Sequence, residues 1–320
     1  MITYPWTSAR HLRVDLTGYA LALAFTLALL NVNVALGAQS PQRTGSFDIG
    51  NTHVDKYGAG EPALILIPGL TDSAKAWTGT ILHFEPTHTI YALTLAGFGG
   101  RAAAQSPMID KADVDIAALI TREHLNHPIV MGHSMGGFLT IRFAEEHSGL
   151  IGGAIAVDGL PVLAGMDKMT PEERGANPIT RMFESMAKAT PDEFMQGQRK
   201  VLPYLTKAQN VDAVAALSEG ANPAASASYV QELSRADLRP QLDKVTVPLL
   251  ELAPFDPTLD PFNPDSPMKT AADKVHYYQT LLSGDKTAKV ALINDSRHFI
   301  MFDQPQAFYD AVDGFLKTLR

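Results

Sequence analysis

Short apolar runs alternate with longer segments of helical spacing along most of the chain. Such runs predict strands buried in a parallel sheet, because a central strand of this kind is covered on both faces. The runs lie at residues 63–67, 89–94, 128–133, 152–158, 245–252 and 288–293. An alternating stretch at residues 47–57, ended by Gly58-Ala59-Gly60, predicts an early hairpin or edge strand before them.

Helical spacing fills the intervals between these runs. It predicts helices at residues 73–84, 114–125, 178–189, 191–202, 211–218, 227–236, 272–282 and 305–319. An alternation of strands and helices is typical of a doubly wound fold with a mostly parallel sheet. We therefore predict an α/β chain of this architecture.

Residues 160–240 interrupt the alternation, since they carry helical segments and no convincing buried strand. We interpret this segment as a helical cap inserted into the sheet domain. Residues 46–159 and 241–320 then form the α/β core together. Within the second part, residues 254–268 are dense in proline and aspartate, which predicts a loop.

Residues 1–38 have the features of a secretory signal. Arg10 and Arg13 precede an apolar run that begins at Leu16, and small residues follow this run before Gln39. An uncleaved anchor helix is the alternative, because the apolar stretch is nearly long enough to span a bilayer. No basic stop follows it, so we favour the signal and expect a periplasmic or secreted protein. Membrane contact is expected only through this segment, if it stays uncleaved.

Composition narrows the classes of function. The 320 residues are 46% hydrophobic and 19% charged, the balance of a globular chain that can bury a large core. The net charge is −8 and no basic block lies beyond the N-terminus, so no nucleic-acid partner is expected. The absence of cysteine excludes disulfides, a cysteine nucleophile and cysteine-ligated metal sites. The sequence leaves the oligomeric state open.

The apolar run at residues 128–133 leads directly into Gly132-His133-Ser134-Met135-Gly136. This segment matches G-x-S-x-G, the nucleophile elbow between a strand and a helix. A serine on such a tight turn has a strained backbone, so its neighbours must be too small to clash. Its hydroxyl then projects at the carboxyl end of the strand, which makes Ser134 the candidate nucleophile. A glycine-rich turn with a spectator serine is the alternative.

A serine hydroxyl needs a base to take its proton and a carboxylate to orient that base. In chains with this elbow the partners follow in the order serine, acid, histidine. His298 lies after the last predicted strand and before the closing helix, so we predict it as the base.

Three aspartates compete for the role of the acid. Asp256 follows the strand that precedes the last one, and we choose it for this position. Asp260 lies a few residues further on. Asp158 ends an earlier predicted strand, from which an acid can also reach the histidine. Each has an alternative role as a loop-capping residue, which is common for aspartate near proline and glycine.

Two backbone amides are predicted to bind the oxyanion. One is the N–H of Met135, directly after the nucleophile. The other comes from the loop after residues 63–67, where we choose the N–H of Leu70. Gly69 lets the backbone approach closely at this point, although Pro68-Gly69 could also be a simple turn.

Together these motifs resemble the α/β-hydrolase superfamily, from about Phe47 to the C-terminus. The residues that carry the resemblance are Pro68-Gly69-Leu70, Gly97-Phe98-Gly99, the elbow through Gly137, Asp256, and His298-Phe299 followed by Asp303-Gln304-Pro305. The resemblance implies an eight-stranded, mostly parallel sheet, a helical cap after the sixth strand, and an acyl-enzyme cycle without cofactor or metal. Many members have His-Gly at the oxyanion loop, where this chain has Pro68-Gly69. A serine at the elbow disfavours epoxide hydrolases and haloalkane dehalogenases, which attack with a carboxylate.

The predicted function is therefore a serine hydrolase that cleaves small-molecule carboxylic esters. The same triad could cleave an amide, a lactone or a carbon–carbon bond, or perform perhydrolysis, because all share the acyl-enzyme step. An alternative of another class is a non-catalytic ligand receptor on the hydrolase fold, with the cap as its lid. The motifs do not specify the substrate or its chain length.

Overall fold

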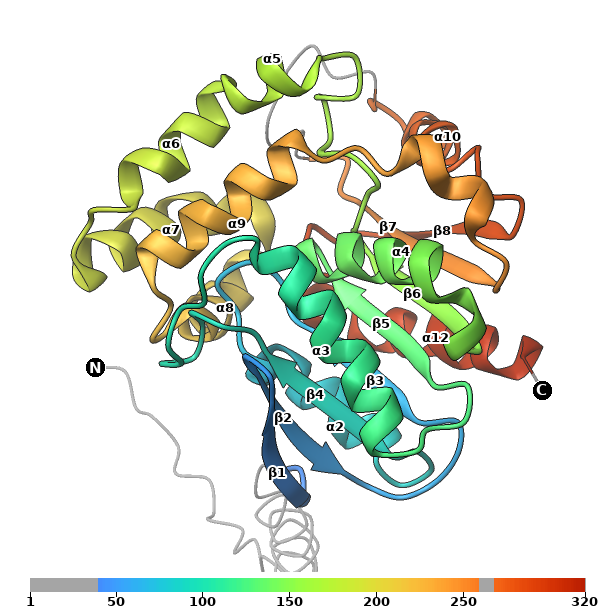
Figure 1. The fold of residues 1–320 in the computed structure, drawn as a ribbon. Coiled ribbons are helices and arrows are strands. Elements are labelled where there is room, and N and C mark those ends of the chain that lie inside the picture. The colour runs from blue at the N-terminus through green and yellow to red at the C-terminus, as the bar shows by residue number, and fades with distance from the viewer. Residues whose placement is uncertain (1–39, 259–267, 320) are drawn as a thin grey trace, which may run out of the picture. The chain divides into compact units, whose positions relative to one another are not determined.

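A computed structural model describes residues 40–258 and 268–319 of the chain (Figure 1). The predicted signal segment, residues 1–38, and the candidate acid Asp260 lie outside the described residues. Within the described part, no helix combines the length and the apolar character needed to cross a membrane.

One eight-stranded sheet runs through the described residues in the order β1-β2-β4-β3-β5-β6-β7-β8. Its strands are β1 (Arg43–Ile49), β2 (Thr52–Tyr57), β3 (Leu64–Ile67), β4 (Ile90–Thr94), β5 (Ile129–His133), β6 (Gly153–Val157), β7 (Leu249–Phe255) and β8 (Ala288–Asn294). All neighbours from β4 to β8 pair parallel, whereas β2 pairs antiparallel with both β1 and β4. The predicted doubly wound, mostly parallel sheet is confirmed.

Helices cover both faces of this sheet, because successive side chains of a strand point to opposite sides. On β3, Ile65 and Ile67 join one core cluster, whereas Leu64 and Leu66 join the other. Figure 1 shows α3 (Met108–Arg122) and α4 (Met135–His147) in front of the sheet, with α2 (Thr78–Phe84) and α12 (Pro305–Thr318) behind it. Strands β3 to β6 are buried along their whole length, as their unbroken apolar runs predict.

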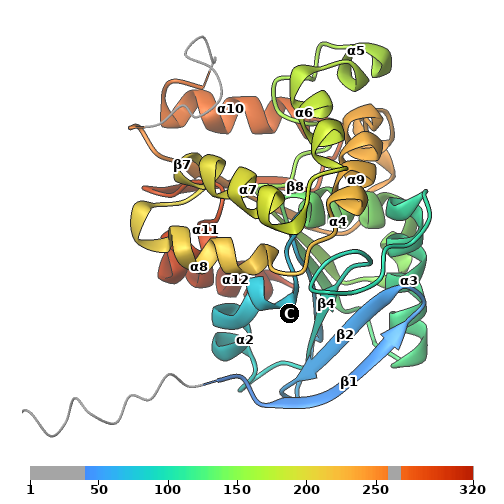
Figure 2. The ribbon, with the colours of Figure 1, turned by 90° about the vertical axis from the view of Figure 1, so that its left-hand side faces the viewer.

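The segment between β6 and β7 is helical. Its helices are α5 (Pro171–Gly175), α6 (Pro178–Met186), α7 (Pro191–Leu205), α8 (Val211–Ala215) and α9 (Pro223–Arg235), which we call the cap helices. The starts of α5 and α7 follow from sequence, because Thr170 and Thr190 each form a capping box with the glutamate three residues later. Periodicity did not predict α5, which is too short to show a repeat. Figure 2 shows α7 and α8 above α12.

One buried carboxylate joins the cap helices to the core. Oδ1 of Asp303, in α11 (Ile300–Asp303), accepts hydrogen bonds from the Thr206 hydroxyl at 2.7 Å, the Lys207 N–H at 2.9 Å and the Asn210 amide at 2.8 Å. Its Oδ2 accepts the N–H of Arg297 at 2.9 Å. The segment after α7 is thereby fixed to the loop that carries His298.

Candidate active site

Ser134 lies on the turn between β5 and α4, as the elbow motif requires. Its φ of 55° and ψ of −117° are unfavourable for a residue with a side chain, so the turn is strained. The Ser134 N–H donates to the Val157 carbonyl at 2.9 Å. A Cβ on Gly132 would lie 1.9 Å from the Gly136 oxygen, and one on Gly136 would lie 2.3 Å from the Ile67 oxygen. Both glycines are therefore necessary for this position of the serine.

His298 lies between β8 and α11, at the place where the sequence predicts the base. Its Nδ1 is 2.5 Å from Oδ2 of Asp158. Asp158 directly follows β6, and its N–H donates to the Leu252 carbonyl of β7 at 2.9 Å. Since β6, β7 and β8 are parallel neighbours, their carboxyl ends meet at one edge of the sheet, and the two side chains come together there.

Asp256, the chosen acid, does not pair with His298. Its Oδ2 instead accepts a hydrogen bond from Nε of Arg297 at 2.9 Å, and its Oδ1 accepts from the N–H and hydroxyl of Thr258 at 2.9 and 2.6 Å. Arg297, the residue before His298, thus pairs with the Asp256 carboxylate that directly follows β7. The partner of His298 is corrected from Asp256 to its rival Asp158.

Asp158 is held in its charged form. Burial alone would raise the pKa of its carboxyl, but His298, Lys274 and the Tyr278 hydroxyl outweigh burial and lower that pKa to about 2. The Tyr278 hydroxyl, from α10 (Ala271–Leu281), donates to Oδ1 of Asp158. Burial and the neighbouring Asp158 keep the pKa of Tyr278 well above its usual value, so the phenol retains its proton. Each oxygen of the Asp158 carboxylate therefore has one donor, His298 at Oδ2 and Tyr278 at Oδ1.

Glu251 is a second buried acid beside Asp158 that sequence reasoning missed. It lies within β7, and its Oε1 accepts the Gly159 N–H at 3.2 Å. Burial, reinforced by the charge of Asp158, raises the pKa of Glu251 well above its usual value, so it is neutral. A glutamate inside the apolar run 249–252 was the available sequence signal, because such a position is otherwise hydrophobic.

The two predicted oxyanion donors belong to segments that adjoin Ser134. Met135 is the first residue of α4, where backbone N–H groups have no acceptor within the helix. Leu70 lies in the turn after β3, which the Asp72 N–H closes by donating to the Gly69 carbonyl at 3.2 Å. A Cβ on Gly69 would lie 3.4 Å from Cβ of Ser134. This close approach is the expected arrangement of an oxyanion loop.

Ser134 and His298 both line a cavity of about 170 Å³. Leu70, Asp72 and His133 line it as well. The cap helices and the turns between them supply most of the remaining wall: Phe183, Gln198, Val201, Leu202, Leu205, Val214 and Ser218. No lysine or arginine is among the described residues that line it. The site is a small, largely apolar cavity without a cationic wall.

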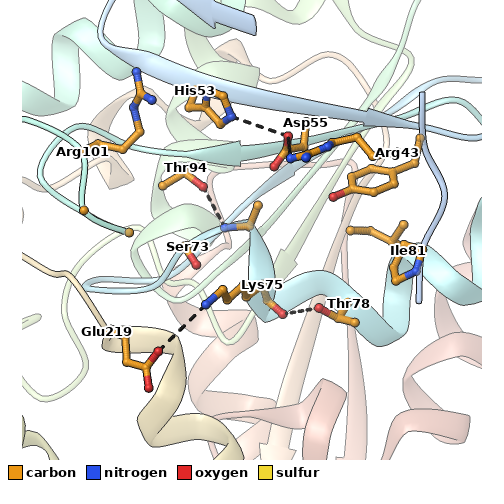
Figure 3. Close-up of a pocket in the computed structure, with 15 residues that line it drawn as sticks. Arg43, His53, Asp55, Ser73, Lys75, Thr78, Ile81, Thr94, Arg101 and Glu219 are labelled. Atoms are coloured by element: carbon orange, nitrogen blue, oxygen red, sulfur yellow. Dashed lines mark hydrogen bonds and ion pairs between the residues drawn. The ribbon is translucent and has the colours of Figure 1, made fainter. Parts of the chain in front are cut away.

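A larger cavity of about 520 Å³ lies on the other side of the Asp72–Ser73 step, and the described residues that line it include neither Ser134 nor His298 (Figure 3). Its charged groups are paired with acidic side chains. Arg43 lies 2.8 Å from Asp55, and Lys75 lies 4.0 Å from Glu219. Arg101 likewise lies 2.8 Å from Asp48. Among the described residues that line it, the larger cavity therefore has neither Ser134 nor an arginine or lysine without an acidic partner.

One cluster of described residues has the spacing of metal ligands. The ligand atoms of Asp113, Glu146 and His147 lie within 4.8 Å of one another, near the end of α4 remote from Ser134. These groups are already paired, because His147 Nε2 is 2.8 Å from Asp113 and Arg142 Nε is 3.3 Å from Glu146. We assign no metal to this cluster.

Characterised proteins of similar sequence are hydrolases. The 3-oxoadipate enol-lactonase 2 of Acinetobacter baylyi is 25% identical over 265 residues, which cover 81% of this chain and 90% of that protein. The pimeloyl-[acyl-carrier protein] methyl ester esterase of Legionella pneumophila is 25% identical over 270 residues, which cover 83% of this chain and all of that protein.

Solved structures of low sequence identity share the fold. The enol-lactonase of Burkholderia xenovorans superposes with a TM-score of 0.67 at 18% identity, over 87% of this chain and 100% of that one. A thermophilic esterase of Thermogutta terrifontis gives the same TM-score at 18% identity, over 88% of this chain and 99% of that one.

The sequence also matches the alpha/beta hydrolase family over residues 64–311, which include the elbow, Asp158 and His298. This match covers most of the chain and agrees with the sheet order and the elbow. The chain belongs to the alpha/beta hydrolase family.

Proposed function

We propose that this hydrolase cleaves carboxylic esters through an acyl-enzyme intermediate, with Ser134, His298 and Asp158 as its triad. The observation that carries the proposal is the contact of His298 with Asp158, together with the cavity that His298 and the elbow serine both line. Esterases and a lactonase among the relatives support the same reaction class.

The proposed reaction has two halves. In the first, Nε2 of His298 takes the proton of the Ser134 hydroxyl as its oxygen attacks the ester carbonyl. The N–H groups of Leu70 and Met135 bind the oxyanion, while the charged Asp158 stabilises the imidazolium. The tetrahedral intermediate then collapses. The bond between the carbonyl carbon and the alcohol oxygen breaks, and the alcohol leaves with the proton from His298. In the second half, water replaces the alcohol and the same steps release the carboxylic acid.

The cavity favours an uncharged acyl group of short or medium length. Its volume of about 170 Å³ and its leucine, valine and phenylalanine walls suit an alkyl chain. An anionic acyl group would need a cationic side chain to replace its lost hydration, and the described lining has none. We therefore propose simple esters as substrates over esters or lactones that carry a second carboxylate.

Two matched substrates test this proposal on the mature protein. Hydrolysis of p-nitrophenyl butyrate is compared with that of mono-p-nitrophenyl succinate, which has a similar length and a terminal carboxylate. We expect the butyrate to react faster by about tenfold or more, and Ser134→Ala to lower kcat by several orders of magnitude. Equal rates for the wild type and Ser134→Ala, or no turnover of any ester, would exclude the proposal and favour a receptor. Faster hydrolysis of the succinate ester would exclude only the proposed preference for uncharged acyl groups.

We propose further that residues 1–38 are an export signal, on the basis of their basic start and apolar run. The test is the intact mass of the protein recovered from a bacterial periplasm. The expected result is the mass of a chain that begins near Gln39. Full-length protein in the membrane fraction would instead support an anchor.

A further inference from the structure

The turn that presents the Leu70 amide has an unfavourable backbone. Thr71 has a φ of 71°, in the left-handed region where a β-branched residue is an outlier. Glycine or asparagine would adopt this conformation more easily. The turn is therefore expected to keep its shape only if contacts outside it hold it in place.

One such contact is to the cap helices. The Thr71 hydroxyl lies 2.8 Å from the hydroxyl of Ser218, and both side chains are buried. Ser218 ends the 3₁₀ turn Ala216–Ser218, which follows α8. This hydrogen bond fixes the outer side of the turn.

The inner side faces two buried polar atoms, one on Asp72 and one on His133, that have no hydrogen-bond partner. Asp72 is 2% exposed, and its Oδ2 has no partner. This oxygen lies 4.0 Å from Nδ1 of His133, the elbow residue before Ser134. The Nδ1 atom also has no hydrogen-bond partner. Gly69 lies against both atoms, since a Cβ there would be 2.9 Å from the imidazole nitrogen and 3.1 Å from the carboxyl oxygen.

Each group of this pair is neutral, so the short distance is no salt bridge. His133 donates from Nε2 to the His298 carbonyl at 3.0 Å, which leaves a lone pair on Nδ1. Burial lowers the pKa of His133 to about 3. Burial raises the pKa of Asp72 to about 8, so its carboxyl carries a proton at neutral pH. One donor therefore faces one acceptor across a gap that a small rotation of the Asp72 side chain closes.

We propose that Asp72 is a positioning residue, which donates its carboxylic O–H to Nδ1 of His133 and so holds the Leu70 amide at the oxyanion. The pair continues from His133 to the His298 carbonyl, so it joins the oxyanion turn, the elbow and the base. The inference rests on the proposed ester hydrolysis, because it assigns a role within that site.

Ionisation of Asp72 removes the donor and leaves two acceptors facing each other. The resulting carboxylate also lies beside the elbow, where it opposes the negative charge that develops on the substrate oxygen. The titratable groups nearest the turn are His133 and His298 on its inner side, and the exposed Lys75–Glu219 pair beyond it. His133 supplies no positive charge to offset the carboxylate, because burial lowers the pKa of its imidazole to about 3.

The first experiment is the pH dependence of kcat for p-nitrophenyl butyrate between pH 6 and 10. Wild-type kcat is expected to fall about tenfold by pH 9 from its plateau, as for loss of one proton with a pKa near 8. Asp72→Asn keeps an N–H donor without a titration, so its kcat stays near the wild-type plateau and shows no such fall. Asp72→Ala lowers kcat below the wild-type plateau with little change in KM, and it shows no such fall.

Glu145→Gln is the matched control, because Glu145 is also buried, also has an unpartnered oxygen and also has its pKa raised to about 8 by burial. It lies on α4 and does not line the cavity. This variant should retain the wild-type fall. An identical fall in Asp72→Asn, or a wild-type kcat in Asp72→Ala, would overturn the proposal. Circular dichroism at each pH shows that the variants compared are folded.

A second readout does not depend on turnover. In ¹⁵N-histidine-labelled protein, the Nδ1 shift of His133 is expected to change between pH 6 and 10 in the wild type and to stay constant in Asp72→Asn. A constant shift in both proteins would overturn the pairing. If no ester is hydrolysed, the proposed function fails, and this spectrum alone decides whether the pair exists.

Discussion

Replacement of Asp158 by asparagine tests which acid serves the site. The asparagine keeps the size of the side chain but removes the charge that lies 2.5 Å from Nδ1 of His298. Its amide can also present an N–H to that nitrogen, which favours the wrong tautomer of the base. In the proposed mechanism, the imidazolium that forms during acylation then lacks its counter-charge.

The expected loss is large. Neutralising the aspartate of a serine triad lowers kcat by about 10⁴, or about 5 kcal/mol of transition-state stabilisation. The variant also loses stability. Because the pKa of Asp158 is lowered to about 2 in the folded state, its stabilising effect is present above about pH 4 and is lost as pH falls toward 2. At neutral pH this amounts to about 2 kcal/mol in the free energy of unfolding.

The matched variant is Asp256→Asn, which neutralises the acid that sequence position favoured. It weakens the contact with Arg297, but that guanidinium keeps its bonds to the carbonyls of Pro203 and Thr206. We expect kcat within about threefold of wild type and a loss of about 1 kcal/mol in stability. The assay is kcat and KM for p-nitrophenyl butyrate at neutral pH, below the unfolding temperature of each variant. A large loss of kcat in Asp256→Asn, with a small loss in Asp158→Asn, would refute the assignment of Asp158 as the acid.

Two further variants probe groups around the site. Tyr278→Phe removes the O–H donor to Asp158 and should lower kcat about tenfold with KM unchanged, whereas the neighbouring Tyr277→Phe, whose hydroxyl bonds Asp167, should leave kcat unchanged. Asp303→Ala removes the acceptor that fixes the cap segment to the core and should lower the free energy of unfolding in urea by about 3 kcal/mol, against less than about 0.5 kcal/mol for the exposed Asp310→Ala. A loss in Tyr277→Phe equal to that in Tyr278→Phe, or equal stability of the two alanine variants, would contradict these expectations.

Local patterns were sufficient to predict most of the fold. The strands from β3 to β8 and the positions of Ser134 and His298 depend on features within a few residues, such as an apolar run or the small neighbours of a strained turn. The acid depends on the packing of distant segments instead. Asp158 and Asp256 follow adjacent parallel strands, so both reach the same edge of the sheet. Sequence position alone could not rank them.

Other groups of the site left little trace in the sequence. Glu251 was visible as a glutamate within an apolar run, but nothing in the sequence around it indicates that it lies beside Asp158 in the fold. Asp72 lies in a polar stretch where an aspartate is ordinary, and only the folded chain buries it beside His133. A pKa shifted by burial depends on the surrounding atoms, so the protonation states of these acids could be inferred only from the structure.

The two aspartates after β6 and β7 contact neighbouring residues of the loop between β8 and α11. Asp158 contacts the imidazole of His298, whereas Asp256 contacts the guanidinium of Arg297, the residue before it. That guanidinium also donates to the carbonyls of Pro203 and Thr206, at 2.6 and 3.0 Å, near the end of α7. A shift of α7 would therefore strain the hydrogen bonds of Arg297 and displace the backbone next to His298. Since α7 also supplies Leu202 and Leu205 to the cavity wall, the residues that shape the cavity and those that place His298 are connected through the Arg297 side chain.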